Sequence, residues 1–236
     1  MSHESLCFAD RVDAGRRLAA AIGPEGFADP LVMALPRGGV PVAFEVAAIL
    51  GAPLELLIVR KIGAPGHAEF GLGALVDGDE PQLVLNAEAM RLVSPSKEYL
   101  KAETARQRLE LERRRRLYLG DRPRISPEKR NVVIVDDGIA TGGTVSAAVQ
   151  ALRKAGAAAL MIAVPVAPPS AIASLRRQVD RVVCLATPHP FHAVSIYYDD
   201  FEQTTDAEVI ALMGRAKGEG PGSAEGNGST GSDEIE

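Results

Sequence analysis

Two adjacent carboxylates, Asp136 and Asp137, directly follow four apolar residues, 132–135. Four apolar residues of this kind predict a buried strand, so both acids are expected at the carboxyl end of a parallel sheet, where open α/β sheets bind ligands. Five small residues come next and open onto a helical pattern at 145–152: Ala140, Thr141, Gly142, Gly143 and Thr144. Free backbone N–H groups, hydroxyl donors and a helix N-terminus together favour a bound anion.

A phosphorylated sugar is the ligand that suits both halves of this segment. Its phosphate would lie in residues 140–144, and its hydroxyl groups would donate to the carboxylates of Asp136 and Asp137. The same two carboxylates are candidate ligands for Mg²⁺, a hard cation that prefers oxygen.

Strand-like and helical segments alternate along the chain and place these residues. Apolar runs of strand length occur at 31–35, 54–59, 132–135, 160–164 and 181–186, and helical patterns at 9–22, 40–50, 97–119, 144–155 and 169–178. Strands that are apolar throughout are typical of a parallel sheet covered by helices on both faces. The sequence therefore predicts an α/β fold with a Rossmann-like parallel sheet.

Composition narrows the class of protein. The chain has 236 residues, of which 46% are hydrophobic, and its two cysteines, Cys7 and Cys184, are too few for a disulfide framework. No secretory signal core and no membrane-length apolar run is visible, so a cytoplasmic protein without a membrane partner is expected. The net charge, 26 − 31 = −5, argues against bulk binding of nucleic acid.

Residues 132–144, VVIVDDGIATGGT, resemble the phosphoribosyl pyrophosphate (PRPP) motif of the type I phosphoribosyltransferases. The resemblance covers about residues 10–210 and is closest to uncharacterised bacterial members. It implies that Asp136 and Asp137 hold the ribose hydroxyls and that residues 140–144 hold the 5′-phosphate. It also implies a small hood subdomain, here mainly 187–205, and a homodimer.

Two basic segments resemble other parts of that family. Leu35-Pro36-Arg37-Gly38-Gly39 is similar to its pyrophosphate loop, with Arg37 as the cation, Gly38 and Gly39 allowing close backbone approach, and Pro36–Arg37 as a candidate cis peptide. The alternative is a helix-capping turn with a solvent-facing arginine. Arg60-Lys61 resembles an Arg-Lys pair of adenine-type members, although charges at strand ends are also common.

Two further segments are candidates for catalysis and for acceptor binding. The glycine-rich stretch 63–71 falls where the family has a mobile catalytic loop, so Glu69 is expected to assist a nitrogen and His67 to contact pyrophosphate, unless the stretch is a polar surface loop. In 187–205, Phe191 or Tyr197 would stack on an acceptor base, or else these rings pack a small subdomain.

The resemblance implies transfer of the 5-phosphoribosyl group from PRPP to a nitrogen nucleophile, with Mg²⁺ and release of pyrophosphate. Arg37 and Lys61 would share the charge of the diphosphate. Ala140 stands where the 6-oxopurine enzymes carry an aspartate, so a nucleobase-like acceptor other than a 6-oxopurine, as in nucleotide salvage, is expected.

A helical insert at about 86–120 supports a rival hypothesis. The region 97–130 holds twelve basic and six acidic residues, including the run 113–116. It is either a solvated helix face or a partner patch, and in the second case the protein could be a PRPP-sensing regulator that binds nucleic acid. After this domain, 1–213, residues 214–236 form an acidic Gly/Ser-rich segment that is expected to be disordered.

Overall fold

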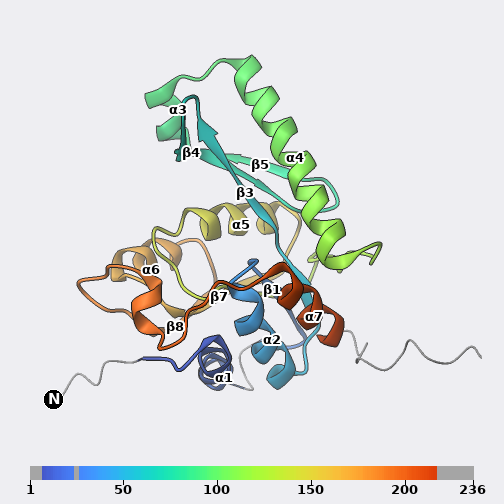
Figure 1. The fold of residues 1–236 in the computed structure, drawn as a ribbon, viewed down its shortest axis with the longest axis vertical. Helices are drawn as coiled ribbons and strands as arrows, with labels where there is room; N and C mark the ends of the chain where they lie inside the picture. Colours follow the sequence, from blue (N-terminus) through green and yellow to red (C-terminus); the bar gives the residue numbers. More distant parts are fainter. Residues whose placement is uncertain (1–6, 24–26, 217–236) are drawn as a thin grey trace, which may run out of the picture.

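Five parallel strands form the centre of the protein, between two layers of helices (Figure 1). The computed structural model describes residues 7–23 and 27–216. The strand order is β2-β1-β6-β7-β8, and the bounds are β1 (Pro30–Ala34), β2 (Leu54–Leu56), β6 (Asn131–Val135), β7 (Ala159–Val166) and β8 (Arg181–Ala186). All four strand pairings are parallel. The predicted parallel α/β sheet is confirmed.

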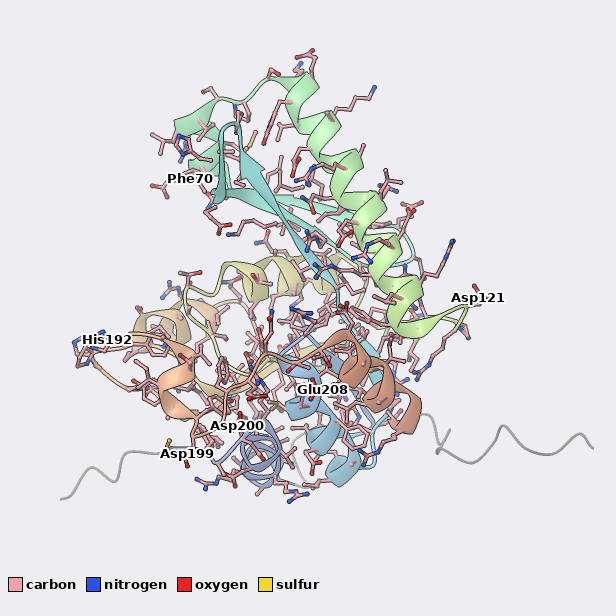
Figure 2. All side chains as sticks on the ribbon, in the orientation of Figure 1. Phe70, Asp121, His192, Asp199, Asp200 and Glu208 are labelled. Atoms are coloured by element: carbon pink, nitrogen blue, oxygen red, sulfur yellow. The ribbon has the colours of Figure 1, made fainter. Side chains whose placement is uncertain are left out.

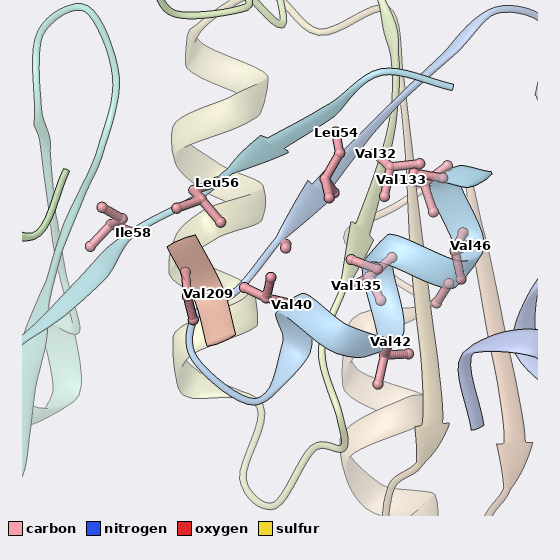
Figure 3. Close-up of a cluster of buried hydrophobic side chains, with 14 of the residues drawn as sticks. Val32, Val40, Val42, Val46, Leu54, Leu56, Ile58, Val133, Val135 and Val209 are labelled. Carbon is pink, nitrogen blue, oxygen red and sulfur yellow. The ribbon is translucent and has the colours of Figure 1, made fainter. Parts of the chain in front are cut away.

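Alternate residues of each strand enter different halves of the core, because successive side chains point to opposite faces. Val32 and Ala34 of β1 pack against the helices on one face of the sheet, and Leu31 and Met33 pack against those on the other face. The first face carries α1 (Arg11–Ile22), α2 (Gly39–Leu50) and α7 (Asp206–Ala216), and the second carries α5 (Gly143–Lys154) and α6 (Pro169–Leu175). Figure 3 shows this side of the sheet, with valines of α2 against valines of β1 and β6, and with Val209 of α7 beside Val40 and Leu56.

A second, antiparallel sheet lies above α5 (Figure 1). Its order is β3-β4-β5, with β3 (Val59–Ala64), β4 (His67–Val76) and β5 (Gln82–Leu85), and it is followed by α3 (Ala87–Val93) and α4 (Lys97–Leu119). Ala74 and Val76 of β4 join the same apolar cluster as the helix α5. This cluster attaches the antiparallel unit to the parallel sheet.

The antiparallel sheet departs from the sequence prediction in two places. The expected strand 54–59 is interrupted at Leu57-Ile58, and the expected loop 63–71 is a hairpin that turns at Pro65-Gly66, where Gly66 has φ +71°. A side chain at Gly63 would lie 2.6 Å from the Ala68 carbonyl oxygen, so the two strands approach closely only because this position is glycine. Glycine content had indicated a loop, and here it serves a tight strand pair.

The basic run of the insert lies on α4, and two of its four arginines pair within that helix. Arg113 and Arg114 pair with Glu110 at 2.7 and 2.8 Å, and the side chain of Arg115 is buried. The pairs of Arg113 and Arg114 fit the solvated-face interpretation of the helix, whereas the buried Arg115 lies on the packed side. Among the described ranges, no helix has the length and apolar content needed to cross a membrane.

The end of the described chain differs slightly from the expected domain boundary. Residues 214–216 form the last turn of α7, and the rest of the segment expected to be disordered, 217–236, lies outside the described residues. Between β8 and α7 the segment 187–205 contains one short 3₁₀ helix, Val194–Tyr197.

Candidate active site

The order of the strands reverses at β1, and in open α/β sheets such a reversal leaves a crevice at the carboxyl ends of the strands. From β1 the chain passes to β2 on one side, while β6 pairs with β1 on the other. Ala34 is in register with Val135, and the Leu35 N–H donates to the Val135 carbonyl at 2.9 Å, so both strands end together. Segments 35–39 and 136–144 therefore leave the sheet side by side at a topological switch point, where ligands bind in open α/β sheets.

The acid pair rests on the glycines of the neighbouring segment. A Cβ atom at Gly38 would overlap Asp137 Oδ2, and one at Gly39 would lie 2.9 Å from the Asp136 Cα atom. Sequence reasoning assigned these glycines to close approach of a ligand. In the structure they give room to the two carboxylates, which pack directly on the Gly38-Gly39 backbone.

Asp137 has a basic partner that the sequence did not indicate. The Arg11 Nε atom donates to Asp137 Oδ2 at 2.9 Å, and only 12% and 15% of the two side chains are exposed. Asp136 Oδ1 accepts the Asp137 N–H at 2.9 Å. The expectation that both carboxylates face only a ligand is therefore incomplete. Arg11 lies 126 residues from Asp137, and no local pattern marks the pairing.

Burial makes negative charge costly at this pair. Removal from water raises the pKa of Asp136 well above its usual range, and repulsion by Asp137 adds to the rise. Removal from water also raises the pKa of Asp137, although the Arg11 guanidinium opposes that effect. A cation or hydroxyl donors at the pair would stabilise its ionised form.

Residues 140–144 form an open cradle at the start of α5. Gly142 precedes the helix in a left-handed conformation, φ +82°, and no side chain caps the helix there. Residues 140, 141, 143 and 144 are exposed or half-buried. Because the first N–H groups of any helix have no intrahelical acceptor, those of α5 are available to an anion.

Arg37 lies at the edge of the crevice, beside α7. The Pro36–Arg37 peptide is cis, as the resemblance predicts. The Arg37 Nη1 atom lies 3.3 Å from Asp206 Oδ1, which also accepts a 2.7 Å hydrogen bond from the Tyr118 hydroxyl. The sequence predicts the Arg37 side chain either against a diphosphate or in solvent, and neither alternative includes Asp206 as a partner.

Four other candidates lie in the antiparallel unit. Arg60 donates to Gln107 of α4 at 3.0 Å, and burial followed by the charge of a nearby arginine lowers its pKa. Lys61 pairs with Glu69 at 3.0 Å, where the Glu69 side chain is almost fully exposed, and His67 begins β4. Within the described residues, no hydrogen bond or ion pair joins these four to the acid pair. Phe70, the residue after Glu69, is labelled on the β3–β4 hairpin in Figure 2.

The segment 187–205 reaches the acid pair through a residue other than the two proposed. Phe191 and Tyr197 stack on each other, with ring centroids 5.8 Å apart and planes 16° apart. The Tyr198 hydroxyl donates to the Asp137 carbonyl oxygen at 2.6 Å. Figure 2 shows His192 at the outer end of the segment and Asp199 and Asp200 where it returns beside α1.

The donor set fits a metal only when a ligand completes it. Among residues 7–23 and 27–216, no group of three or more His, Cys, Asp or Glu could hold a metal ion. Mg²⁺ takes six oxygens, usually with several from water and phosphate. The carboxylate oxygens of Asp136 and Asp137 could supply part of that shell, and in the described residues the Arg11 guanidinium pairs with Asp137.

A carboxylate pair and an uncapped helix N-terminus at a switch point define an α/β protein whose site suits a sugar phosphate or nucleotide. The model of the phosphoribosyl transferase domain matches residues 9–200, and the chain belongs to that family. Two Mycobacterium tuberculosis proteins, from strains CDC 1551 / Oshkosh and H37Rv, each named "Putative phosphoribosyl transferase", are 45% identical over 209 residues. The match covers 89% of this chain and 47% of each relative, so the chain spans about half the length of these relatives.

A solved structure has a similar fold over most of this chain. The crystal structure of the protein TT1426 from Thermus thermophilus is 44% identical and superposes with a TM-score of 0.74. The match covers 88% of this chain and 97% of that chain. The fold described above is thus the fold of a solved relative over nearly its full length.

Proposed function

We propose that this protein transfers the 5-phosphoribosyl group from PRPP to a nitrogen nucleophile and releases pyrophosphate. One observation carries the proposal: the acid pair and the open N-terminus of α5 follow the same strand at the switch point, and the helix begins at Gly143, six residues after Asp137. That spacing suits the two ends of one ribose 5-phosphate. Membership of the phosphoribosyl transferase family supports the same reaction class.

In this proposal each group of residues has a separate task. The first N–H groups of α5 and the threonine hydroxyls bind the 5′-phosphate. Asp136 and Asp137 accept hydrogen bonds from the ribose hydroxyls, and their negative charge favours the cationic sugar carbon as its bond to pyrophosphate breaks. The nitrogen attacks from the opposite side, which inverts the configuration at that carbon.

Arg37 is the residue proposed to bind the diphosphate. It follows β1 at the same sheet edge as the acids, and its present partner, Asp206, is a half-exposed carboxylate that a diphosphate can replace. Lys61 and Glu69 contribute only if the β3–β4 hairpin moves toward the crevice, since they now pair with each other. Their predicted catalytic roles, and those of Arg60 and His67, remain predictions.

Magnesium is the cofactor that the donor set favours. Asp136 and Asp137 would hold it together with oxygens of PRPP and water. Bound there, Mg²⁺ would supply positive charge to the departing diphosphate.

The acceptor is proposed to be a nucleobase-like nitrogen compound other than a 6-oxopurine. Ala140 offers no carboxylate to such a base. Phe191 and Tyr197 would face the acceptor only if their mutual stack opens. A homodimer and a cytoplasmic location stay predictions, and a role in nucleic-acid binding gains no support from the contacts on α4.

A pyrophosphate-release screen tests this function. The full chain is incubated with PRPP and Mg²⁺ against purines, pyrimidines and simple amines, beside an Asp136→Asn/Asp137→Asn double variant. Asp121→Asn, a change of an exposed acid on the loop after α4, is the matched control (Figure 2). We expect release with at least one acceptor, lost in the double variant and kept in the control. Release that survives in the double variant contradicts the proposal.

A further inference from the structure

Arg11 of α1 contacts both the acid pair and the segment that follows β8. We infer that Arg11 is a positioning residue: it fixes the orientation of the Asp137 carboxylate and ties it to residues 198–202. The inference rests on the proposed function, because it assigns a role in holding PRPP through Asp137.

The first contact is a buried ion pair. Arg11 Nε donates to Asp137 Oδ2 at 2.9 Å, from side chains that are 12% and 15% exposed. The same carboxylate lies on the backbone of Gly38, so it is held between a guanidinium and a glycine. Both restraints act on Oδ2, which orients the carboxylate as a whole.

The second contact joins Arg11 to the segment after β8. Its Nη1 atom donates to the Glu202 carbonyl oxygen at 2.7 Å, and its guanidinium lies 3.9 Å from the centre of the Phe201 ring. An arginine fork can make such contacts in two directions at once, which a lysine cannot. Arg11 therefore spans from the acid pair to residues 201–202.

A third contact closes the connection independently of Arg11. The Tyr198 hydroxyl donates to the Asp137 carbonyl oxygen at 2.6 Å, and its ring packs against Phe8 and Phe201. The backbone N–H of Asp199 also donates to the Phe8 carbonyl at 2.9 Å. The segment 197–201 is thus anchored beside α1, so Arg11 has a fixed support from which to hold Asp137.

Two other arginines of α1 provide the contrast. Arg16 pairs with Glu45 and Arg17 pairs with Asp13, with 64% and 47% of the arginine side chains exposed. Exposed pairs of this kind are weak. Removal of one partner from a buried pair leaves an uncompensated charge. Of these three arginines only Arg11 pairs with Asp137, so only its replacement is expected to change the orientation of that carboxylate.

The test compares PRPP affinity, measured by isothermal titration calorimetry with Mg²⁺, in wild type, Arg11→Met, Arg11→Lys and Arg16→Met. A misplacement of about 1 Å can lower a catalytic rate about 100-fold, and PRPP affinity is expected to depend on the position of the carboxylate in a similar way. We expect Arg11→Met to weaken PRPP binding by about 10- to 100-fold, and Arg11→Lys to recover part of the loss. Arg16→Met, on the same helix, is expected to bind as wild type.

A double-mutant cycle separates this role from a general structural one. If Arg11 acts through Asp137, then Arg11→Met adds little further loss in an Asp137→Asn background, because residues that act as a unit are not additive. Thermal unfolding of each variant is recorded in parallel. A structural role alone would lower the melting temperature and add its full effect in both backgrounds.

The outcomes distinguish failure of the proposed function from failure of the role assigned to Arg11. Wild-type protein that does not bind PRPP overturns the proposed function. Wild-type binding together with unchanged binding by Arg11→Met, or full additivity with Asp137→Asn, overturns the role of Arg11 and leaves the function intact. If Arg11→Met does not fold, Arg11→Lys decides, since wild-type affinity in that variant contradicts a requirement for the fork.

Discussion

The Tyr118 hydroxyl donates a 2.7 Å hydrogen bond to Oδ1 of Asp206, and so α4 and α7 meet at a carboxylate beside the site. The same oxygen lies 3.3 Å from Arg37 Nη1. If Arg37 binds the diphosphate of PRPP as proposed, Asp206 would compete with it for the guanidinium. The bond from Tyr118 and the charge of Arg37 both lower the pKa of Asp206, so it remains ionised near neutral pH.

Replacement of this competitor should favour PRPP. We expect Asp206→Asn to tighten PRPP binding by up to about fivefold, a small gain because exposed ion pairs are weak. Calorimetry at low and high salt checks this, and the gain should shrink as salt rises. Asp121→Asn removes the same charge elsewhere, and an equal gain there would show that only net charge matters.

Gly38 should tolerate no side chain. A Cβ atom there would overlap Asp137 Oδ2, so Gly38→Ala must push the carboxylate aside. We expect PRPP affinity to fall by about 10-fold or more, while the far-ultraviolet circular dichroism spectrum stays that of wild type. Unchanged PRPP affinity in a folded Gly38→Ala protein would show that the position of this carboxylate is unimportant.

Arg115 should stabilise the junction of the two sheets. Its Nη1 atom lies 3.2 Å from Asp77 Oδ2 and 3.6 Å from Glu55 Oε1, among side chains that are almost fully buried. Loss of one partner from a buried pair costs about 3–5 kcal/mol. Asp77 keeps Arg124 at 2.6 Å, so we expect Arg115→Met to cost about 3 kcal/mol, near the lower end of that range.

Thermal unfolding measures this change. A loss of that size lowers the melting temperature by about 6–12 °C in a chain of this length. The exposed neighbour is the control, and Arg116→Met should melt within about 1 °C of wild type. Equal melting temperatures of Arg115→Met and Arg116→Met would show that the ion pairs of Arg115 contribute nothing to stability.

Glu110 should contribute to stability at neutral pH and lose that contribution in acid. Hydrogen bonds from Arg113 and Arg114 lower its pKa from 4.5 to about 2 in the folded protein. A lowered folded-state pKa stabilises the fold above pH 4.5, and the effect disappears as the pH falls from 4.5 toward 2. Solvent screens this surface site, so the contribution is a few tenths of a kcal/mol.

The measurement is the melting temperature of wild type and Glu110→Gln across pH 2 to 7, a range that brackets the two pKa values. We expect wild type to melt about 1–2 °C higher at pH 7 and the difference to vanish near pH 2. A difference that persists unchanged at low pH would show that packing, rather than charge, accounts for it.

Local patterns predicted the parallel sheet and the alternation of its strands with helices along the chain. The apolar run 132–135 and the residues that follow specify a strand, a turn and a helix within a short stretch, so their structure depends on near neighbours. The same holds for β1 and the segment Leu35–Gly39. Long-range pairing explains most of what the sequence did not reveal.

Arg11 and Tyr198 are the clearest cases. They meet Asp137 across 126 and 61 residues of chain, and nothing in their immediate sequence distinguishes them from other charged or aromatic residues. The β3–β4 hairpin is different, because Pro65-Gly66 is a turn signal between two strand-length segments. That signal was present, but the surrounding glycines favoured a loop interpretation.

The alternation of β1 and β6 side chains between two halves of the core has a genetic consequence. A slip of one residue in either strand would exchange the faces and carry the acids or the Pro-Arg-Gly-Gly turn away from each other. In a selection for inactive mutants, substitutions at buried positions of these strands should then be isolated as often as substitutions of the proposed ligand-binding residues. Such a screen would show that the packing of these strands and the residues of the site are both required for activity.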